Sequence, residues 1–176
     1  MDVLWRAYLL HPETPAEGQQ LPDAIQRRMA STLDALRRRA RASGREMVAP
    51  PIISNTRRAH EAAFFARDTG RHEAFHQAVF HAYYGEGKDI GRWDVLEEAA
   101  REAGLDPDAM RRAVEAGTYR DAVETELESA RELGITGVPT FIFDDRLAVV
   151  GAQPFEVFRQ AMAELERDGG GNDAST

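Results

Sequence analysis

The chain has 176 residues, 43% of them hydrophobic, and a net charge of −8 at pH 7. This length fits about one domain with a sizeable core, and the negative charge argues against a general nucleic-acid-binding protein. There is no uninterrupted run of about 18 apolar residues and no basic start before a long apolar stretch, so we expect no membrane span, no signal peptide and a cytoplasmic protein.

The first quarter of the chain predicts a strand, a loop and a helix. Residues 3–10 alternate imperfectly between apolar and polar positions, which indicates a short strand. A loop rich in proline and glycine follows at 11–22. Residues 23–43 predict a helix, because apolar residues recur at helical spacing and a glycine follows. Two consecutive prolines then break the chain, and Ile52-Ile53 predicts a short extended piece.

Helices follow one another through the middle of the chain. Asp106-Pro107 is typical of an N-cap residue with proline at the first helical position. Glycines at positions 70 and 85 indicate where helices end. The predicted helices cover residues 56–68, 71–84, 93–103, 107–116 and 119–133.

The last part of the chain predicts a hairpin and a helix. Residues 140–143 and 147–150 are apolar and flank Asp144-Asp145-Arg146, a tight hairpin signal. Their continuous apolar character predicts strands that are covered on both faces. Pro154 indicates the start of a last helix, and the composition of residues 168–176 predicts a disordered tail.

The chain contains no cysteine. Disulfides, thiolate metal sites and thiol nucleophiles are therefore excluded within these residues. Charge is distributed unevenly, since residues 1–67 carry 11 arginines against seven acids and the rest carries 11 basic residues against 23 acids. We interpret the arginine cluster as a solvated helix face, with an anionic partner as the alternative. It comprises Arg27, Arg28, Arg37, Arg38, Arg39, Arg41 and Arg45.

Several stretches, in a shared order, resemble one family. They include Trp5-Arg6 with Leu10-His11-Pro12-Glu13, Ile53-Ser54-Asn55-Thr56, Gly87-Lys88-Asp89-Ile90-Gly91, Gly137-Val138-Pro139-Thr140-Phe141 and Gly151-Ala152-Gln153-Pro154. Over most of residues 3–165 the chain resembles the DsbA-type thiol–disulfide oxidoreductases, particularly their FrnE-like branch. The resemblance implies an α/β, thioredoxin-like fold with a large α-helical insertion. Residues 1–22 and 134–167 would form the thioredoxin-like part, and residues 23–133 the insertion.

The resemblance also implies a first strand and a helix that carries Cys-x-x-Cys, and both are missing from this sequence. In the family this strand lies between the strand of Trp5 and the strand of Thr140, so two exposed strand edges would remain. We expect one of three explanations. The natural product starts upstream, another copy or protein supplies the strand, or the sheet has rearranged into a redox-dead module.

The predicted substrate-binding residues are Gly137, Val138, Pro139 and Thr140, because the family's cis-proline loop presents its backbone to an extended substrate. A rigid turn before the strand is the alternative. His60 falls where the family's groove lies, and a structural helical histidine is its alternative. The resemblance implies thiol–disulfide exchange on protein or small-thiol substrates. We expect no cofactor, and the charge and the lack of a long apolar run predict no nucleic-acid or membrane partner. The alternative is a non-catalytic binding or assembly module that uses the Val138-Pro139 edge, and the exposed strand edges suggest self-association.

Two further hypotheses concern a zinc site and glutathione binding. His72-Glu73-Ala74-Phe75-His76 matches H-E-x-x-H, in which two histidines hold Zn²⁺ and the glutamate acts as a base, with Glu97 or Glu98 as third ligand. We interpret this match as coincidental, because the helix is short and fits the family's insertion without a metal. The kappa transferases and hydroxychromene carboxylate isomerases are similar in architecture, but they carry an acidic residue where this chain has Gly151-Ala152-Gln153-Pro154. This departure makes glutathione binding a weaker expectation.

Overall fold

The computed structural model describes residues 3–48 and 50–169. In this part of the chain it shows helices and two small antiparallel sheets, grouped in two compact units that divide between Leu127 and Glu128. Among the described residues, no helix combines the length and the apolar character that crossing a membrane requires.

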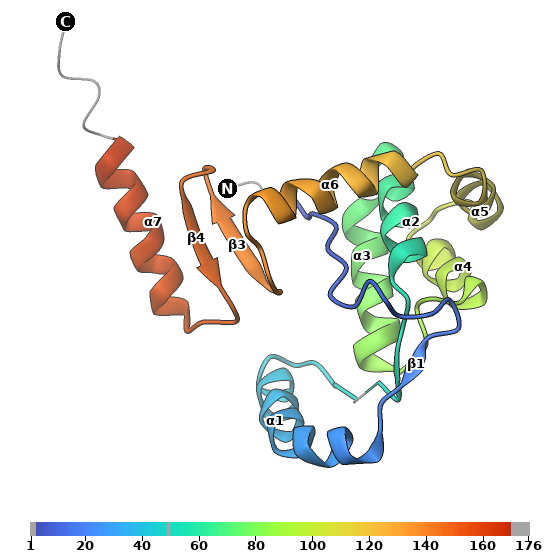
Figure 1. Ribbon diagram of the computed structural model, residues 1–176, viewed down its shortest axis with the longest axis horizontal. Helices are drawn as coiled ribbons and strands as arrows, with labels where there is room; N and C mark the ends of the chain where they lie inside the picture. Colours follow the sequence, from blue (N-terminus) through green and yellow to red (C-terminus); the bar gives the residue numbers. More distant parts are fainter. Residues whose placement is uncertain (1–2, 49, 170–176) are drawn as a thin grey trace, which may run out of the picture. The chain divides into compact units, whose positions relative to one another are not determined.

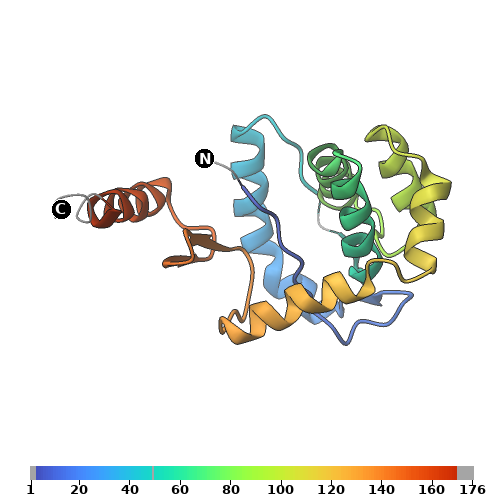
Figure 2. The same ribbon diagram turned by 90° about the horizontal axis from the view of Figure 1, so that it is seen from above.

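Four helices form the body of the first unit (Figure 1). They are α2 (Arg57–Asp68), α3 (His72–Phe80), α4 (Trp93–Glu102) and α5 (Pro107–Glu115), and Figure 2 shows the same helices from above. All four were predicted and are confirmed. Local signals mark where these helices begin and end. The side chain of Asp106, for example, accepts hydrogen bonds from the first-turn amides of α5.

The core of this unit combines small and large side chains. Ala62 and Ala66 of α2 are fully buried, so α2 can approach its neighbours closely. Phe75, Leu96 and Met110 fill the space between α3, α4 and α5, and each is at most 1% exposed. Removing one of these large side chains would leave a cavity.

Helix α3 continues into a π-helical turn, η1 (His81–Gly85). The predicted helix over residues 71–84 is therefore confirmed, with a wider last turn. Gly85 ends this turn, where a Cβ atom would lie 2.5 Å from Nδ1 of His81. Only glycine fits without a shift of the histidine ring.

Helix α1 (Asp23–Ala42) stands apart from α2–α5 in the same unit (Figure 1). In chain order it falls between two short strands, β1 (Gln19–Gln20) and β2 (Ile52–Ile53), which pair antiparallel with each other. The helix and the extended piece at Ile52-Ile53 were predicted and are confirmed, whereas β1 was not predicted because its glutamines carry no strand signal.

The predicted strand at residues 3–10 is wrong, since residues 3–9 have no regular secondary structure. A strand needs a neighbouring strand to pair with its backbone, and none of the described strands pairs with this segment. Side chains, and not a neighbouring strand, make hydrogen bonds to the backbone of this segment. The N–H of Ala7 donates to the carboxylate of Glu126, and the carbonyl of Tyr8 lies 3.1 Å from Nε2 of His60.

Helix α6 (Arg120–Glu132) was also predicted. In the first unit, its residues Val123 and Leu127 pack with Ala7 and Phe64 in a small second core. This core ties the start of the chain to α2 and α6.

The second unit contains a hairpin of β3 (Thr140–Phe143) and β4 (Leu147–Val150), followed by α7 (Phe155–Gly169). These elements were predicted and are confirmed. Phe158 of α7 packs edge-on against Phe141, with ring centroids 4.8 Å apart. The hairpin turn places Asp144 and Asp145 at φ of 49° and 54°, in the left-handed region.

The expectation that both faces of the hairpin are covered is wrong for the described residues. Phe141 and Ile142 are each 39% exposed, and Val150 is 62% exposed. Continuous apolar character does not require two covering layers when the hairpin has one helix beside it. The division into residues 1–22 with 134–167 and residues 23–133 stays a prediction. Residues 168 and 169 of the predicted tail belong to α7, and 170–176 lie outside the described residues.

Candidate functional site

The loop that precedes β3 is closed by hydrogen bonds at both of its sides. The Val138–Pro139 peptide bond is cis. The hydroxyl of Thr140 donates to the carbonyl of Gly137 at 2.8 Å, and the N–H of Gly151 donates to the carbonyl of Pro139 at 2.8 Å. The structure thus brings four of the predicted site residues together in one tied loop.

Val138 is the part of this loop that remains open to a ligand. Its side chain is 51% exposed. Among the described residues, its N–H and C=O make no hydrogen bond. One donor and one acceptor on the same residue can pair with an extended peptide, as a strand edge does.

His60, the fifth predicted residue, lies on α2 in the first unit. Its Nε2 lies 3.1 Å from the carbonyl of Tyr8. A carbonyl only accepts, so Nε2 carries the hydrogen and Nδ1 of the neutral ring carries the lone pair. Burial lowers the pKa of His60, while the bond to Tyr8 and the nearby Glu126 act in the opposite direction. The ring is a neutral hydrogen-bond donor that fixes Tyr8.

Glu126 is a buried charged residue that the sequence did not single out. Its side chain is 8% exposed and accepts from the N–H of Ala7. Arg6 and Arg67 also contact it, with N–O distances of 3.3 and 3.4 Å. The available signal was its position on the apolar stripe of Val123 and Leu127, where a charge must find partners when it is buried.

A row of rings along α3 and η1 was also missed. The ring of His76 lies 4.0 Å from Trp5 and 4.4 Å from Phe80, measured between centroids. Tyr84 continues the row 5.7 Å beyond Phe80. The signal was the spacing of four residues from His72 to Tyr84, which places His76, Phe80 and Tyr84 on one helix face. The contact of Trp5 with this face has no such signal.

The zinc hypothesis finds no support. The rings of His72 and His76 lie 5.9 Å apart, and burial lowers the pKa of each imidazole. Among the residues that the structure describes, no three His, Cys, Asp or Glu side chains lie close enough together to hold a metal ion. Both candidate third ligands are engaged in ion pairs, Glu97 with Arg111 and Glu98 with the single lysine of the chain.

The predicted site residues therefore divide between the two units. Gly137, Val138, Pro139 and Thr140 lie in the second unit and His60 in the first. The loop in the second unit can bind an extended backbone. The first unit contains an N-terminal segment that Glu126 and His60 hold by hydrogen bonds, and it contains the row of rings. None of these side chains can attack a disulfide, because the chain has no thiol.

A family model described as the DSBA-like thioredoxin domain matches residues 1–163. The chain is 29% identical over 170 residues to the uncharacterized protein YwbO of Bacillus subtilis, covering 95% of this chain and 84% of that protein. The crystal structure of a probable DsbA oxidoreductase from Streptomyces coelicolor is similar with a TM-score of 0.82 and 29% identity, over 90% of this chain and 73% of that one.

A second similarity concerns isomerases. The chain is 30% identical over 86 residues to a 2-hydroxychromene-2-carboxylate isomerase of Sphingobium xenophagum, which is 49% of this chain and 44% of that protein. A solved structure of such an isomerase has a TM-score of 0.70 at 22% identity, covering 86% of this chain and 73% of that one, and shows a shared fold alone. Together these matches confirm the predicted α/β, thioredoxin-like fold with a helical insertion.

Proposed function

This chain belongs to the DSBA-like thioredoxin domain family, and we propose that its 176 residues form the substrate-holding body of an FrnE-like thiol–disulfide oxidoreductase. The observation that carries the proposal is the tied loop before β3, in which Val138 is exposed and its backbone donor and acceptor have no partner among the described residues. Such an edge fits an extended polypeptide or a small thiol compound.

The redox step requires thiols from outside these residues. In thiol–disulfide exchange, a thiolate attacks a disulfide and forms a mixed disulfide, and a second thiol then resolves it. The chain contains no cysteine. By itself it therefore binds substrate and leaves the disulfide intact.

The other expectations from the sequence stay predictions. They are the cytoplasmic location, the lack of a cofactor, and the lack of nucleic-acid and membrane partners. The binding module and the zinc hydrolase are not proposed as separate functions, because no described feature favours them over the family's own chemistry.

The test is a titration of the 176-residue chain with an unfolded polypeptide whose cysteines are permanently alkylated. We expect saturable binding that Val138→Asp weakens about tenfold, because a carboxylate beside the loop repels the incoming backbone carbonyls. Ala148→Asp on β4 is the matched control, since Ala148 is also exposed and lies in the same hairpin. Equal binding by both variants would refute the assignment of the loop.

A turnover assay complements the titration. We expect the 176-residue chain to reduce a peptide disulfide no faster than the buffer does. Turnover above that background would show that a group other than a thiol carries the chemistry, and the proposed division of roles would then be wrong.

A further inference from the structure

The hydroxyl of Thr140 holds the start of the loop that precedes β3. It donates to the carbonyl of Gly137 at 2.8 Å, and this bond is partly buried. Packing does not hold Gly137, because a Cβ atom placed on it would meet no heavy atom within 4 Å apart from its neighbours in the chain. The orientation of this carbonyl therefore depends on the hydrogen bond from Thr140.

The carbonyl of Gly137 and the N–H of Val138 belong to one peptide unit. This unit is trans, since the cis bond of the loop is the next one, between Val138 and Pro139. In a planar trans peptide unit the C=O and the N–H point in opposite directions. The hydroxyl of Thr140 binds the C=O and so directs the N–H of Val138 away from itself. This N–H has no partner among the described residues.

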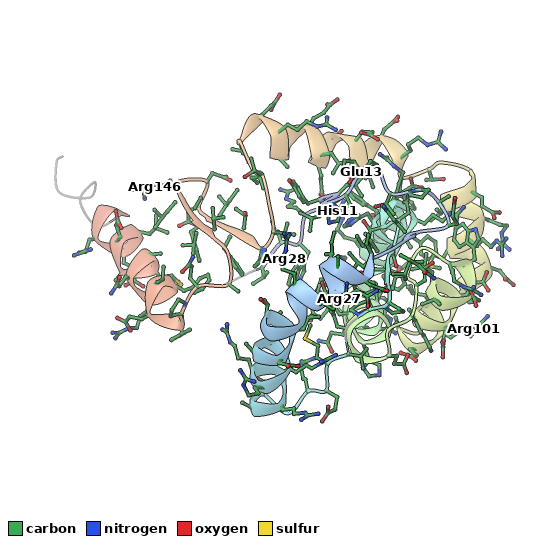
Figure 3. All side chains as sticks on the ribbon, turned by 60° about the horizontal axis from the view of Figure 1, so that its bottom comes forward. His11, Glu13, Arg27, Arg28, Arg101 and Arg146 are labelled. Atoms are coloured by element: carbon green, nitrogen blue, oxygen red, sulfur yellow. The ribbon has the colours of Figure 1, made fainter. Side chains whose placement is uncertain are left out.

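Thr140 itself is held by a regular element. It is the first residue of β3 and pairs with Val150 in the register of the hairpin. The next residue, Phe141, packs against Phe158 of α7. The turn of the hairpin, where Figure 3 labels Arg146, lies at the other end of β3. Because threonine is branched at Cβ, its side chain has few rotamers in a strand. The hydroxyl thus reaches the loop from a fixed position.

The other side of the loop is held by the main chain. The N–H of Gly151 donates to the carbonyl of Pro139 at 2.8 Å. No substitution of a side chain removes this donor directly, apart from proline. The hydroxyl of Thr140, in contrast, can be removed by a single substitution that leaves the rest of the loop in place.

We infer that Thr140 is a positioning residue, whose hydroxyl aims the N–H of Val138 at a backbone carbonyl of the bound polypeptide. The inference rests on the proposed function and deepens it. Thr140 acts through Gly137 and needs no contact with the substrate. Without the hydroxyl, the peptide unit between Gly137 and Val138 can rotate. The apparent affinity then falls with the fraction of molecules in which the N–H points toward the substrate.

The experiment is the titration with the alkylated unfolded polypeptide, applied to variants of Thr140. Thr140→Val keeps the branched shape and removes the hydroxyl, and it should raise the dissociation constant about tenfold, as expected when the N–H is well oriented in about one molecule in ten. Thr140→Ser keeps the hydroxyl and should restore binding. Thr125→Val on α6 is the matched control, because it removes a hydroxyl that donates to the carbonyl of Asp121 at 2.9 Å. It should not change the dissociation constant.

Relaxation of the backbone amides, measured by NMR on the ligand-free chain, separates positioning from a general loss of structure. In Thr140→Val the order parameter of the Val138 amide should fall below about 0.6, the range of flexible backbone. The amides of Phe141 and Val149 within the hairpin should keep their order parameters. Thr140→Ala places no methyl group where the oxygen was, and it should give the same two results together with the same loss of affinity.

Three outcomes would overturn the inference. Thr140→Val and Thr140→Ala bind as tightly as the unchanged chain, Thr140→Ser loses as much affinity as they do, or the Val138 amide stays ordered in all variants. These outcomes differ from a failure of the proposed function. If Val138→Asp binds as tightly as Ala148→Asp, both the function and the inference fail. If Val138→Asp weakens binding and Thr140→Val does not, the loop holds substrate and only the role of the hydroxyl is wrong.

Discussion

Two side chains, Glu126 and His60, give residues 3–9 the hydrogen bonds that a neighbouring strand would otherwise provide. Glu126 comes from α6 and His60 from α2, and they bind adjacent residues of the segment, Ala7 and Tyr8. Because both partners are side chains, single substitutions can test how much each contributes.

Glu126→Ala should lower the free energy of unfolding by about 2 kcal/mol, because it leaves a buried N–H without an acceptor and removes the carboxylate that two arginines contact. Glu124→Ala on the same helix is the control. Glu124 is 41% exposed and pairs with Arg57, and its loss should cost less than about 1 kcal/mol. Urea unfolding measures both, and equal effects would contradict the role of Glu126.

His60 should make stability depend on pH. Burial holds its pKa below the ordinary value of 6.5, so the unfolded chain binds the proton more tightly than the folded protein does. His72 and His76 have pKa values lowered in the same way. Stability should therefore be complete above pH 6.5 and fall as the pH drops toward the folded-state pKa values.

The measurement is urea unfolding at about pH 7.5 and about pH 5.5. His60→Gln should show a smaller loss of stability at the lower pH, because glutamine can still donate to Tyr8 but does not titrate. His81→Gln, at an exposed position, should behave as the unchanged chain. An identical loss in His60→Gln would exclude His60 as a source of the pH dependence.

At the scale of elements, the helices and the local β3–β4 hairpin were predictable, whereas the pairing of strands far apart in the sequence was not. Helix ends are marked locally, as by Asp106 before α5 and the glycine after α1. A strand forms only when another strand pairs with it, and that partner can be far away in the sequence. The apolar pattern of residues 3–10 indicated an extended segment but carried no information about a partner. None of the described strands pairs with this segment.

The candidate site divides in the same way. The loop before β3 was predictable from its sequence and its resemblance to the family. Glu126 and the ring row were not recognised, because their partners are set by tertiary packing.

The hairpin turn offers a prediction for one element. Asp144 and Asp145 both have positive φ, and the N–H of Arg146 donates to the carbonyl of Phe143 across the turn. Asp145→Gly should stabilise the hairpin by about 0.5–1 kcal/mol, because glycine adopts this conformation freely. Asp145→Val should destabilise it. Hydrogen exchange at the Arg146 amide measures both changes, and slower exchange in the valine variant would contradict the assigned turn.

At the scale of the whole molecule, membership of the DSBA-like thioredoxin domain family contrasts with the lack of any thiol in 176 residues. The proposed thiol–disulfide exchange needs a thiolate as its nucleophile, and no other side chain of the chain replaces it. We therefore expect that any form of the protein that turns over disulfides, when isolated from its own cells, has a mass above 19.6 kDa and carries titratable thiols. Intact mass spectrometry with thiol labelling checks this expectation, and turnover at 19.6 kDa would contradict it.

The most direct measurement is site-specific photocrosslinking with a benzophenone side chain placed at Val138 and, separately, at Ala148. The chain is mixed with an unfolded polypeptide whose cysteines are alkylated, so that only non-covalent holding is measured. If Val138 holds the substrate, the label at position 138 should crosslink to the polypeptide, and the label at position 148 should not. Crosslinks of equal yield from both positions, or none from position 138, would contradict the role of this loop in holding substrate.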